Sequence, residues 1–265
     1  MVTTTLALLG LLLLGFGAYL ILLSPVQQSR TQENLYDELA GQLGLATAPV
    51  DGVIVPGAPV AILEIPRLGL RQVVVEGTTS GALMNGPGHR RDTPLPGQAG
   101  VSVILGRSGL YGAPFRDLTA LRAGDEIVVI TGQARSTYAV SGVRTSLDPI
   151  PPPTGAVASL TLSTASPPLA PTQSLLLTAE LTSPVQPGRP DTGAIAVAEK
   201  GLAGDPSAAL PLMLWSQVLL LVVAAASWGY LRWERWPTYV ITTPVLLAVL
   251  WNVYENVAQL LPNTM

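Results

Sequence analysis

The sequence SLTLSTASPP at residues 159–168 decides how the rest of the chain is interpreted. Alternating Thr, Leu and Ser residues predict a β-strand in its first part. The strand ends at the small residues Ala165 and Ser166, and Pro167 and Pro168 then stop it because proline cannot donate a hydrogen bond to a sheet. The stretch therefore predicts a strand that ends at a small residue, and the residue at that end bears most directly on function.

Composition narrows the classes of protein that the chain can belong to. Of its 265 residues, 12% are charged, against about a quarter in an ordinary soluble domain. The net charge of -3 gives no reason to expect a nucleic-acid partner. Cysteine is absent and His89 is the sole histidine, which excludes disulfides, thiol catalysis and thiolate or histidine-rich metal sites. No cofactor or metal is predicted.

Three apolar runs are candidates for membrane spans, at residues 6–23, 210–230 and 238–261. The first run nearly crosses a hydrocarbon core of about 30 Å at about 1.5 Å per residue. The alternative for this run is a cleaved signal peptide, although it has no basic n-region and no clear cleavage site. The alternative for the third run is a helix that packs on a partner protein rather than on lipid.

The short turn between the second and third runs predicts the orientation in the membrane. It contains Arg232 and Arg235 beside Trp233 and Trp236, which suits a cytoplasmic loop with interfacial anchors. We therefore expect a bacterial plasma-membrane protein with a cytoplasmic N-terminus, an extracellular middle domain and an extracellular C-terminus.

The middle of the chain predicts a β-rich domain. Short runs of Val, Ile, Leu and Thr, separated by Gly and Pro, favour a closed barrel or a sandwich. The predicted strands are residues 60–65, 72–76, 101–105, 126–131, 137–144, 158–163 and 175–181, with a helical turn over 115–121. The predicted domains are an N-terminal span (1–24), a helical stalk and linker (25–58), the β domain (59–183), a Pro/Gly-rich linker (184–208) and a membrane hairpin (209–261).

Several short motifs, taken in order, resemble those of sortases, most nearly of classes D, E and F. They are AILEIPRLGL at 61–70, VEGT at 75–78, GPGH at 86–89, TPLPG at 93–97, VILG at 103–106 and a PF…L…L…GD pattern from Pro114 to Asp125. Each motif alone is a weak signal, but their order and spacing together are specific. The resemblance implies a closed eight-stranded β-barrel.

The resemblance also implies a reaction and three catalytic positions. Sortases cut a sorting peptide and join it to an amine, using a cysteine nucleophile, a histidine proton carrier and an arginine that stabilises the oxyanion. In this chain the histidine position falls on Arg107, the cysteine position on Ala165 and the arginine position on or near Ser174. His89 matches the upstream GPGH motif instead. The sequence therefore predicts a pseudoenzyme.

Other roles for individual residues remain open. Ser163 or Thr164 could act as a hydroxyl nucleophile, but neither has an evident base. A laboratory change would explain Ala165 but not Arg107 and Ser174. Arg107 could have one of two structural roles, either pointing to the surface or filling the space left by the missing triad. Alternatively, its guanidinium could project into the cleft of the sortase site and bind a partner's carboxylate. Glu255, with Asn252 and Asn256, is a second binding candidate, because ionisable groups in spanning helices are costly and often functional.

The function expected from these observations is that of a non-catalytic subunit in a membrane or cell-envelope complex, with lipids and other membrane proteins as partners. Three spans exceed what a tether needs, which suggests lateral contacts within the bilayer. The alternatives are a receptor for peptides that resemble sorting signals and an unorthodox transpeptidase or acyltransferase.

Overall fold

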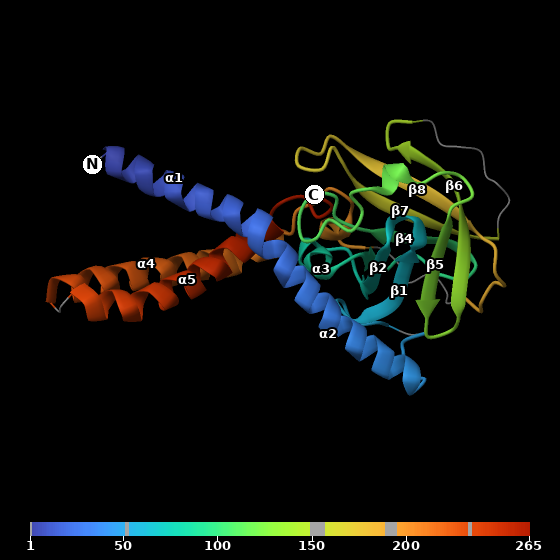
Figure 1. The fold of residues 1–265 in the computed structure, drawn as a ribbon, viewed down its shortest axis with the longest axis horizontal. Coiled ribbons are helices and arrows are strands. Elements are labelled where there is room, and N and C mark those ends of the chain that lie inside the picture. The colour runs from blue at the N-terminus through green and yellow to red at the C-terminus, as the bar shows by residue number, and fades with distance from the viewer. Residues whose placement is uncertain (1, 51–52, 149–156, 189–194, 233–234) are drawn as a thin grey trace.

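A closed β-barrel with apolar helices at both ends of the chain forms the structure, a computed structural model that describes residues 2–50, 53–148, 157–188, 195–232 and 235–265 (Figure 1). The strand order is β1-β2-β3-β4-β7-β8-β6-β5, and β5 pairs with β1 to close the barrel. The strands are β1 Pro59–Ile65, β2 Leu70–Glu76, β3 Gly88–His89, β4 Gly100–Leu105, β5 Glu126–Thr131, β6 Arg135–Thr145, β7 Ala158–Ser166 and β8 Gln173–Leu181.

The inside of the barrel is filled by aliphatic side chains together with Phe115 and Tyr138. Alternation along the strands sends these side chains inwards, which is the pattern that closes a small barrel without a pore. Most neighbouring strands are antiparallel, whereas β2–β3 and β4–β7 are parallel. The parallel β4–β7 pair brings the ends of two strands that are distant in sequence to the same edge.

The predicted eight-stranded barrel is confirmed, and the seven predicted strands correspond to β1, β2 and β4 to β8. Two elements were missed. Strand β3 has only two residues, and helix α3 (Ser80–Asn85) is capped by Thr79, whose hydroxyl accepts from the Ala82 N–H. Elements this short carry no measurable periodicity, so sequence patterns do not find them.

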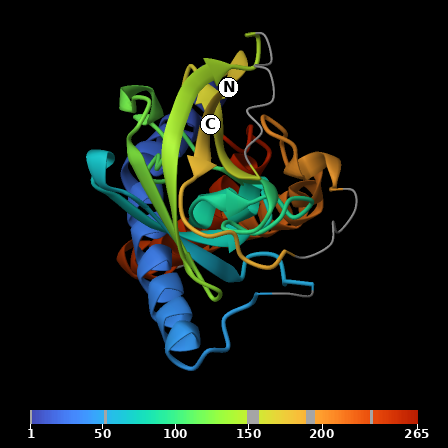
Figure 2. The same ribbon diagram turned by 90° about the vertical axis from the view of Figure 1, so that its right-hand side faces the viewer.

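The N-terminal helix is continuous from the membrane segment onto the side of the barrel. Helix α1 (Val2–Ala18) passes through a π-helical turn, η1 (Tyr19–Leu23), into α2 (Ser24–Gly44) without a break. Leu39 of α2 is buried against Ile62 and Val73 of the barrel. Helix α2 therefore packs along the barrel wall (Figure 2). The prediction that it lifts the domain off a bilayer stays a prediction.

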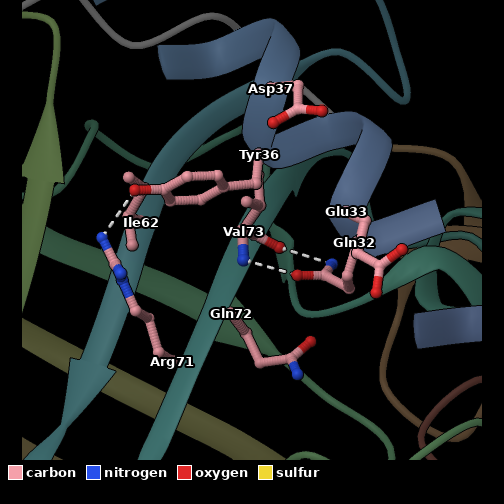
Figure 3. Close-up of a pocket in the computed structure, with 8 residues that line it drawn as sticks. All are labelled: Gln32, Glu33, Tyr36, Asp37, Ile62, Arg71, Gln72 and Val73. Carbon is pink, nitrogen blue, oxygen red and sulfur yellow. Dashed lines mark hydrogen bonds between the residues drawn. The ribbon is translucent and has the colours of Figure 1, made fainter. Parts of the chain in front are cut away.

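Gln32 fixes the position of α2 on strand β2 (Figure 3). Its amide donates to Val73 O at 3.0 Å and accepts from Val73 N at 2.7 Å, as a neighbouring strand would. The same NH₂ group donates to Asn85 O at 2.7 Å. Beside it, Arg71 donates to Tyr36 OH at 2.8 Å and lies over that ring. A groove of about 460 Å³ remains between the two elements.

The C-terminal part forms a helical hairpin, α4 (Ala209–Arg232) and α5 (Arg235–Gln259). Three helical stretches are long and apolar enough to cross a membrane, at Gly10–Gly44, Pro206–Arg232 and Val240–Gln259. Helices α1, α4 and α5 project from the same side of the barrel (Figure 1). The two residues Trp233 and Glu234 of the predicted cytoplasmic turn lie outside the described residues.

The predicted linker over 184–208 is partly ordered against the barrel. Glu199 is buried and forms a bidentate ion pair with Arg91, with N–O distances of 2.7 and 2.6 Å. Thr78 Oγ1 donates to the Glu199 carbonyl at 2.6 Å. Residues 189–194 lie outside the described residues, but the 196–205 segment is a packed part of the domain surface.

Replacing Gln32 tests whether α2 is part of the folded domain. Gln32→Ala leaves Val73 N and O and Asn85 O without their partner, so we expect a loss of about 1–3 kcal/mol in the free energy of unfolding. Gln42→Ala is the matched control on the same helix, because Gln42 donates only to the exposed Glu38 and should change stability by less than about 0.5 kcal/mol. Denaturant unfolding of the detergent-solubilised chain measures both. Equal effects of the two changes would mean that α2 is not docked in solution.

The Glu199–Arg91 pair should make stability depend on acid. Burial raises the pKa of Glu199, but the Arg91 guanidinium, the Ala196 N–H and Thr78 outweigh it and leave that pKa below its usual value. A depressed pKa stabilises the fold above the unfolded value of about 4.3, and the effect is lost as pH falls through the folded value. The difference in melting temperature between the native chain and Glu199→Gln should therefore be largest near pH 7 and shrink below about pH 4. A difference that stays constant down to pH 3 would contradict this.

Candidate functional site

The three positions singled out by the sequence meet at one edge of the barrel, formed by the ends of β4 and β7 and the start of β8. We call this the triad edge. Ala165 of β7 is opposite Ser174 of β8 in the sheet register. Gly106, which follows β4, donates its N–H to Ser163 O at 3.0 Å, so Arg107 begins the loop beside them. The structure thus brings Arg107, Ala165 and Ser174 to neighbouring strand ends.

Arg107 is fully buried, with 0% of its surface exposed. Its guanidinium donates to Leu83 O at 3.2 Å and to Ser80 O and Oγ at 3.0 and 2.9 Å, all on α3. It also lies 4.9 Å from the centre of the Tyr111 ring. The surface-pointing alternative is therefore wrong.

Burial lowers the pKa of Arg107 to about 10, which leaves the group cationic at neutral pH. A buried cation needs acceptors around it. Here they are neutral carbonyl and hydroxyl oxygens and a π face. Among the described residues, no Asp or Glu side chain forms an ion pair with Arg107. The arrangement can hold a fixed positive charge, but a guanidinium is a poor proton carrier near neutral pH because it stays protonated.

Ala165 and the two hydroxyl residues before it offer no activated nucleophile. Ala165 is 3% exposed and carries only a methyl group. Thr164 is buried, and its Oγ1 donates to Gly106 O at 2.7 Å, a bond that holds the loop to the strand end. Hydroxyl groups attack a carbonyl only when a base takes their proton. The carbonyl that Thr164 contacts is not such a base.

His89 is engaged elsewhere. It is buried on β3 with Nδ1 2.9 Å from Glu76 Oε2, while Nε2 lies 3.0 Å from Pro94 O and 3.2 Å from Thr93 Oγ1. A carbonyl oxygen can only accept, so Nε2 carries a proton towards Pro94. Both ring nitrogens are thus used, one by Glu76 of β2 and the other by the turn after β3, as expected for a structural histidine.

The second group of candidates lies where α5 meets the N-terminal helix. Glu255 Oε1 accepts from Gln27 Nε2 at 3.2 Å, and Gln27 Oε1 accepts from Tyr19 OH at 3.1 Å. Asn252 and Asn256 each donate to a carbonyl one turn earlier on α5. These polar groups therefore have partners inside the chain, and the Tyr19 OH lies 3.2 Å from Tyr111 OH of the barrel.

Sequence reasoning missed residues 261–265, which lie against the triad edge. Asn263 and Thr264 are 0% and 1% exposed, and Ser108 N donates to Thr264 O at 3.1 Å. Arg107 Nη1 lies 3.5 Å from Met265 O. A five-residue tail after a helix has no periodicity, so its only sequence signal is the break at Pro262. The described residues contain no group of three His, Asp or Glu side chains that could hold a metal.

Comparison with known proteins finds similarity to sortases within the barrel residues. Residues 63–182 match the Sortase domain family. Sortase D of Bacillus subtilis is 32% identical over 84 residues, which are 32% of this chain and 41% of that protein. The chain thus matches about two fifths of the length of that relative.

Solved sortase structures are also similar to part of this chain. The sortase D5 transpeptidase of Clostridium perfringens is 21% identical with a TM-score of 0.47, over 58% of this chain and 99% of that chain. Sortase E of Streptomyces avermitilis is 32% identical with a TM-score of 0.43, over 56% of this chain and 100% of that chain.

The family match, the ordered motifs and the closed eight-stranded barrel concern the same residues. The barrel of this chain is a domain of the sortase family.

Proposed function

We propose that this protein is a non-catalytic sortase-type membrane protein, a structural or assembly subunit of a complex in the bacterial cell envelope. One observation carries the proposal: the triad edge holds Arg107, Ala165 and Ser174 where sortase chemistry needs an imidazole, a thiol and a guanidinium. The chain has no cysteine at all. Its sole histidine is bonded to Glu76 and Pro94, away from these positions.

The membrane part supports a role in assembly. Ala224, Ala225 and Ser227 are exposed on α4, where small residues allow the backbone of another helix to approach closely. A groove of about 450 Å³ opens between the N-terminal helix and α5, with Tyr19, Trp251 and Tyr254 in its lining. Both surfaces suit a transmembrane helix of a partner or a lipid acyl chain.

The proposed location is the bacterial plasma membrane, with the N-terminus in the cytoplasm and the barrel and residues 261–265 outside. Two features support this arrangement. The barrel and the end of α5 lie on the same side of the three apolar helices, so one membrane face holds both. The α4–α5 turn lies at the opposite end and carries Arg232. Basic residues favour the cytoplasmic face.

Two other functions remain candidates for the same domain. A peptide receptor needs only the shape of the triad edge and no chemistry there. An unorthodox transpeptidase or acyltransferase would have to use Ser163 or Thr164 with a base other than His89. The tests below separate these three.

We expect the purified protein to show no cleavage or transpeptidation of sorting peptides above the level of a heat-inactivated control. The reason is that no thiolate or paired hydroxyl is available to attack the carbonyl. Incubation of several peptides with an amine acceptor, followed by mass spectrometry, measures this. Turnover that disappears in Ser163→Ala or Thr164→Ala would establish the enzyme instead.

Enlarging the small surface of α4 should weaken the complex without unfolding the barrel. Ala224→Leu together with Ala225→Leu adds bulk where close helix approach is expected, so we predict a several-fold lower yield of partners in a mild-detergent pull-down. Ile241→Leu, an exposed position on α5, is the control and should leave the yield unchanged. Unchanged yields in both variants would place the contact with partners elsewhere.

A further inference from the structure

Residues 261–265, Leu-Pro-Asn-Thr-Met, follow α5, form a turn closed by the Met265 N–H donating to Pro262 O at 3.1 Å, and lie against the barrel. We call them the 261–265 segment. It is bounded by α3, the loop after β4 and the 196–205 segment. Asn263 and Thr264, the middle residues, are as deeply buried as the barrel core. Burial of polar side chains costs free energy unless hydrogen bonds offset it, so the partners of these two residues decide what holds the segment.

Asn263 is held like a ligand in a binding site. Its side-chain NH₂ donates to Thr78 O at 2.7 Å and to Lys200 O at 2.9 Å. Its backbone N–H donates to Ala203 O at 2.9 Å. Three carbonyl oxygens from two separate parts of the chain therefore converge on one asparagine. The two that accept from the side-chain NH₂ would select a carboxamide over an apolar or acidic side chain.

The 261–265 segment and the turn that binds it reach the triad edge on two different sides. On one side Ser108, next to Arg107, donates its N–H and hydroxyl to Thr264 O at 3.1 and 3.4 Å. On the other side, a Cβ added at Gly201, next to Lys200, would lie 3.8 Å from Ser174 Oγ. The turn that binds Asn263 therefore lies on the start of β8. Arg107 and Ser174 are covered from two directions by the same arrangement.

Two polar side-chain atoms of the 261–265 segment lack hydrogen bonds. Asn263 Oδ1 and Thr264 Oγ1 are buried and have no hydrogen-bond partner among the described residues. Each buried polar atom without a partner costs free energy that water would restore on release. The segment is thus held by several specific bonds and opposed by two unmade ones. This balance suits a contact that opens.

We propose that the 261–265 segment is a tethered peptide ligand that closes the triad edge, so that the edge admits another peptide only when this segment leaves. The external ligand is a peptide that can form the same turn, with an asparagine carboxamide at the position of Asn263. The proposal is independent of whether the domain is catalytic, because it concerns occupancy and not chemistry.

The native sequence contains no cysteine, so a thiol-specific reagent reacts only with a cysteine that is introduced. Ser108→Cys places a thiol under Thr264 in the full-length protein in detergent. We expect slow maleimide labelling, and labelling at least about tenfold faster when Asn263→Ala removes two hydrogen bonds. Asn252→Ala is the control, since Asn252 bonds only to its own helix, and it should leave the rate unchanged. Far-UV circular dichroism verifies that the barrel remains folded in each variant.

A synthetic peptide with the sequence of residues 260–265 tests the ligand itself. Added to the Asn263→Ala variant, it should slow labelling of the thiol again, while the same peptide carrying the Asn263→Ala change should not. A second pair, Ser108→Cys with Thr264→Cys, should form a disulfide under mild oxidation of the folded protein. Oxidation should then prevent peptide binding, and reduction should restore it.

Any one of four results would overturn the proposal. Fast labelling in the Ser108→Cys parent would mean that the segment does not close the edge. Equal labelling rates with and without the Asn263 side chain would mean that its hydrogen bonds do not control access to the thiol. Failure of the cysteine pair to cross-link would mean that residues 108 and 264 are not in contact in solution. Fast labelling that no peptide slows would leave a cover without a binding site.

Discussion

The buried guanidinium of Arg107 joins more parts of this protein than any other side chain described above. Its charge must be met by acceptors, because an uncompensated ion inside a protein is very costly. The acceptors come from α3 and residue 265, and the ring of Tyr111 covers the remaining face. The Tyr111 hydroxyl then meets Tyr19 of the membrane helix. One charge thus connects the barrel with the apolar helices from both parts of the chain.

This network gives Arg107 a structural role at the triad edge. A histidine at position 107 would have to remain free to exchange protons with a substrate. An arginine there stays charged, so it suits a permanent bond network in place of a proton path. The hydroxyl of Thr164 is likewise used to hold Gly106 in place. The groups left at the triad edge make structural contacts.

The barrel was predictable from sequence because its strands are regular and its turns carry Gly and Pro. The positions of Arg107, Ala165 and Ser174 at one edge followed from the motif order. The docking of α2 through Gln32, the ion pair of Glu199 and the burial of Asn263 did not follow. Each is a contact between residues far apart in the sequence, made by polar side chains that patterns of hydrophobicity assign to the surface. Without such a contact, residues 29–43 have the pattern of a stalk and residues 184–208 that of a linker.

The unbroken helix from Val2 to Gly44 has a mechanical consequence. A helix of this length spans about 65 Å, and its π-helical turn at Tyr19–Leu23 and Pro25 are the sites where it can bend. Its first part lies among apolar residues suited to lipid, and its second part is fixed to strand β2 by Gln32 and Leu39. If the angle at the Tyr19–Leu23 turn is kept, a change in the tilt of the first part also changes the orientation of the barrel. Bilayer thickness or a neighbouring membrane protein could in this way set the direction that the triad edge faces.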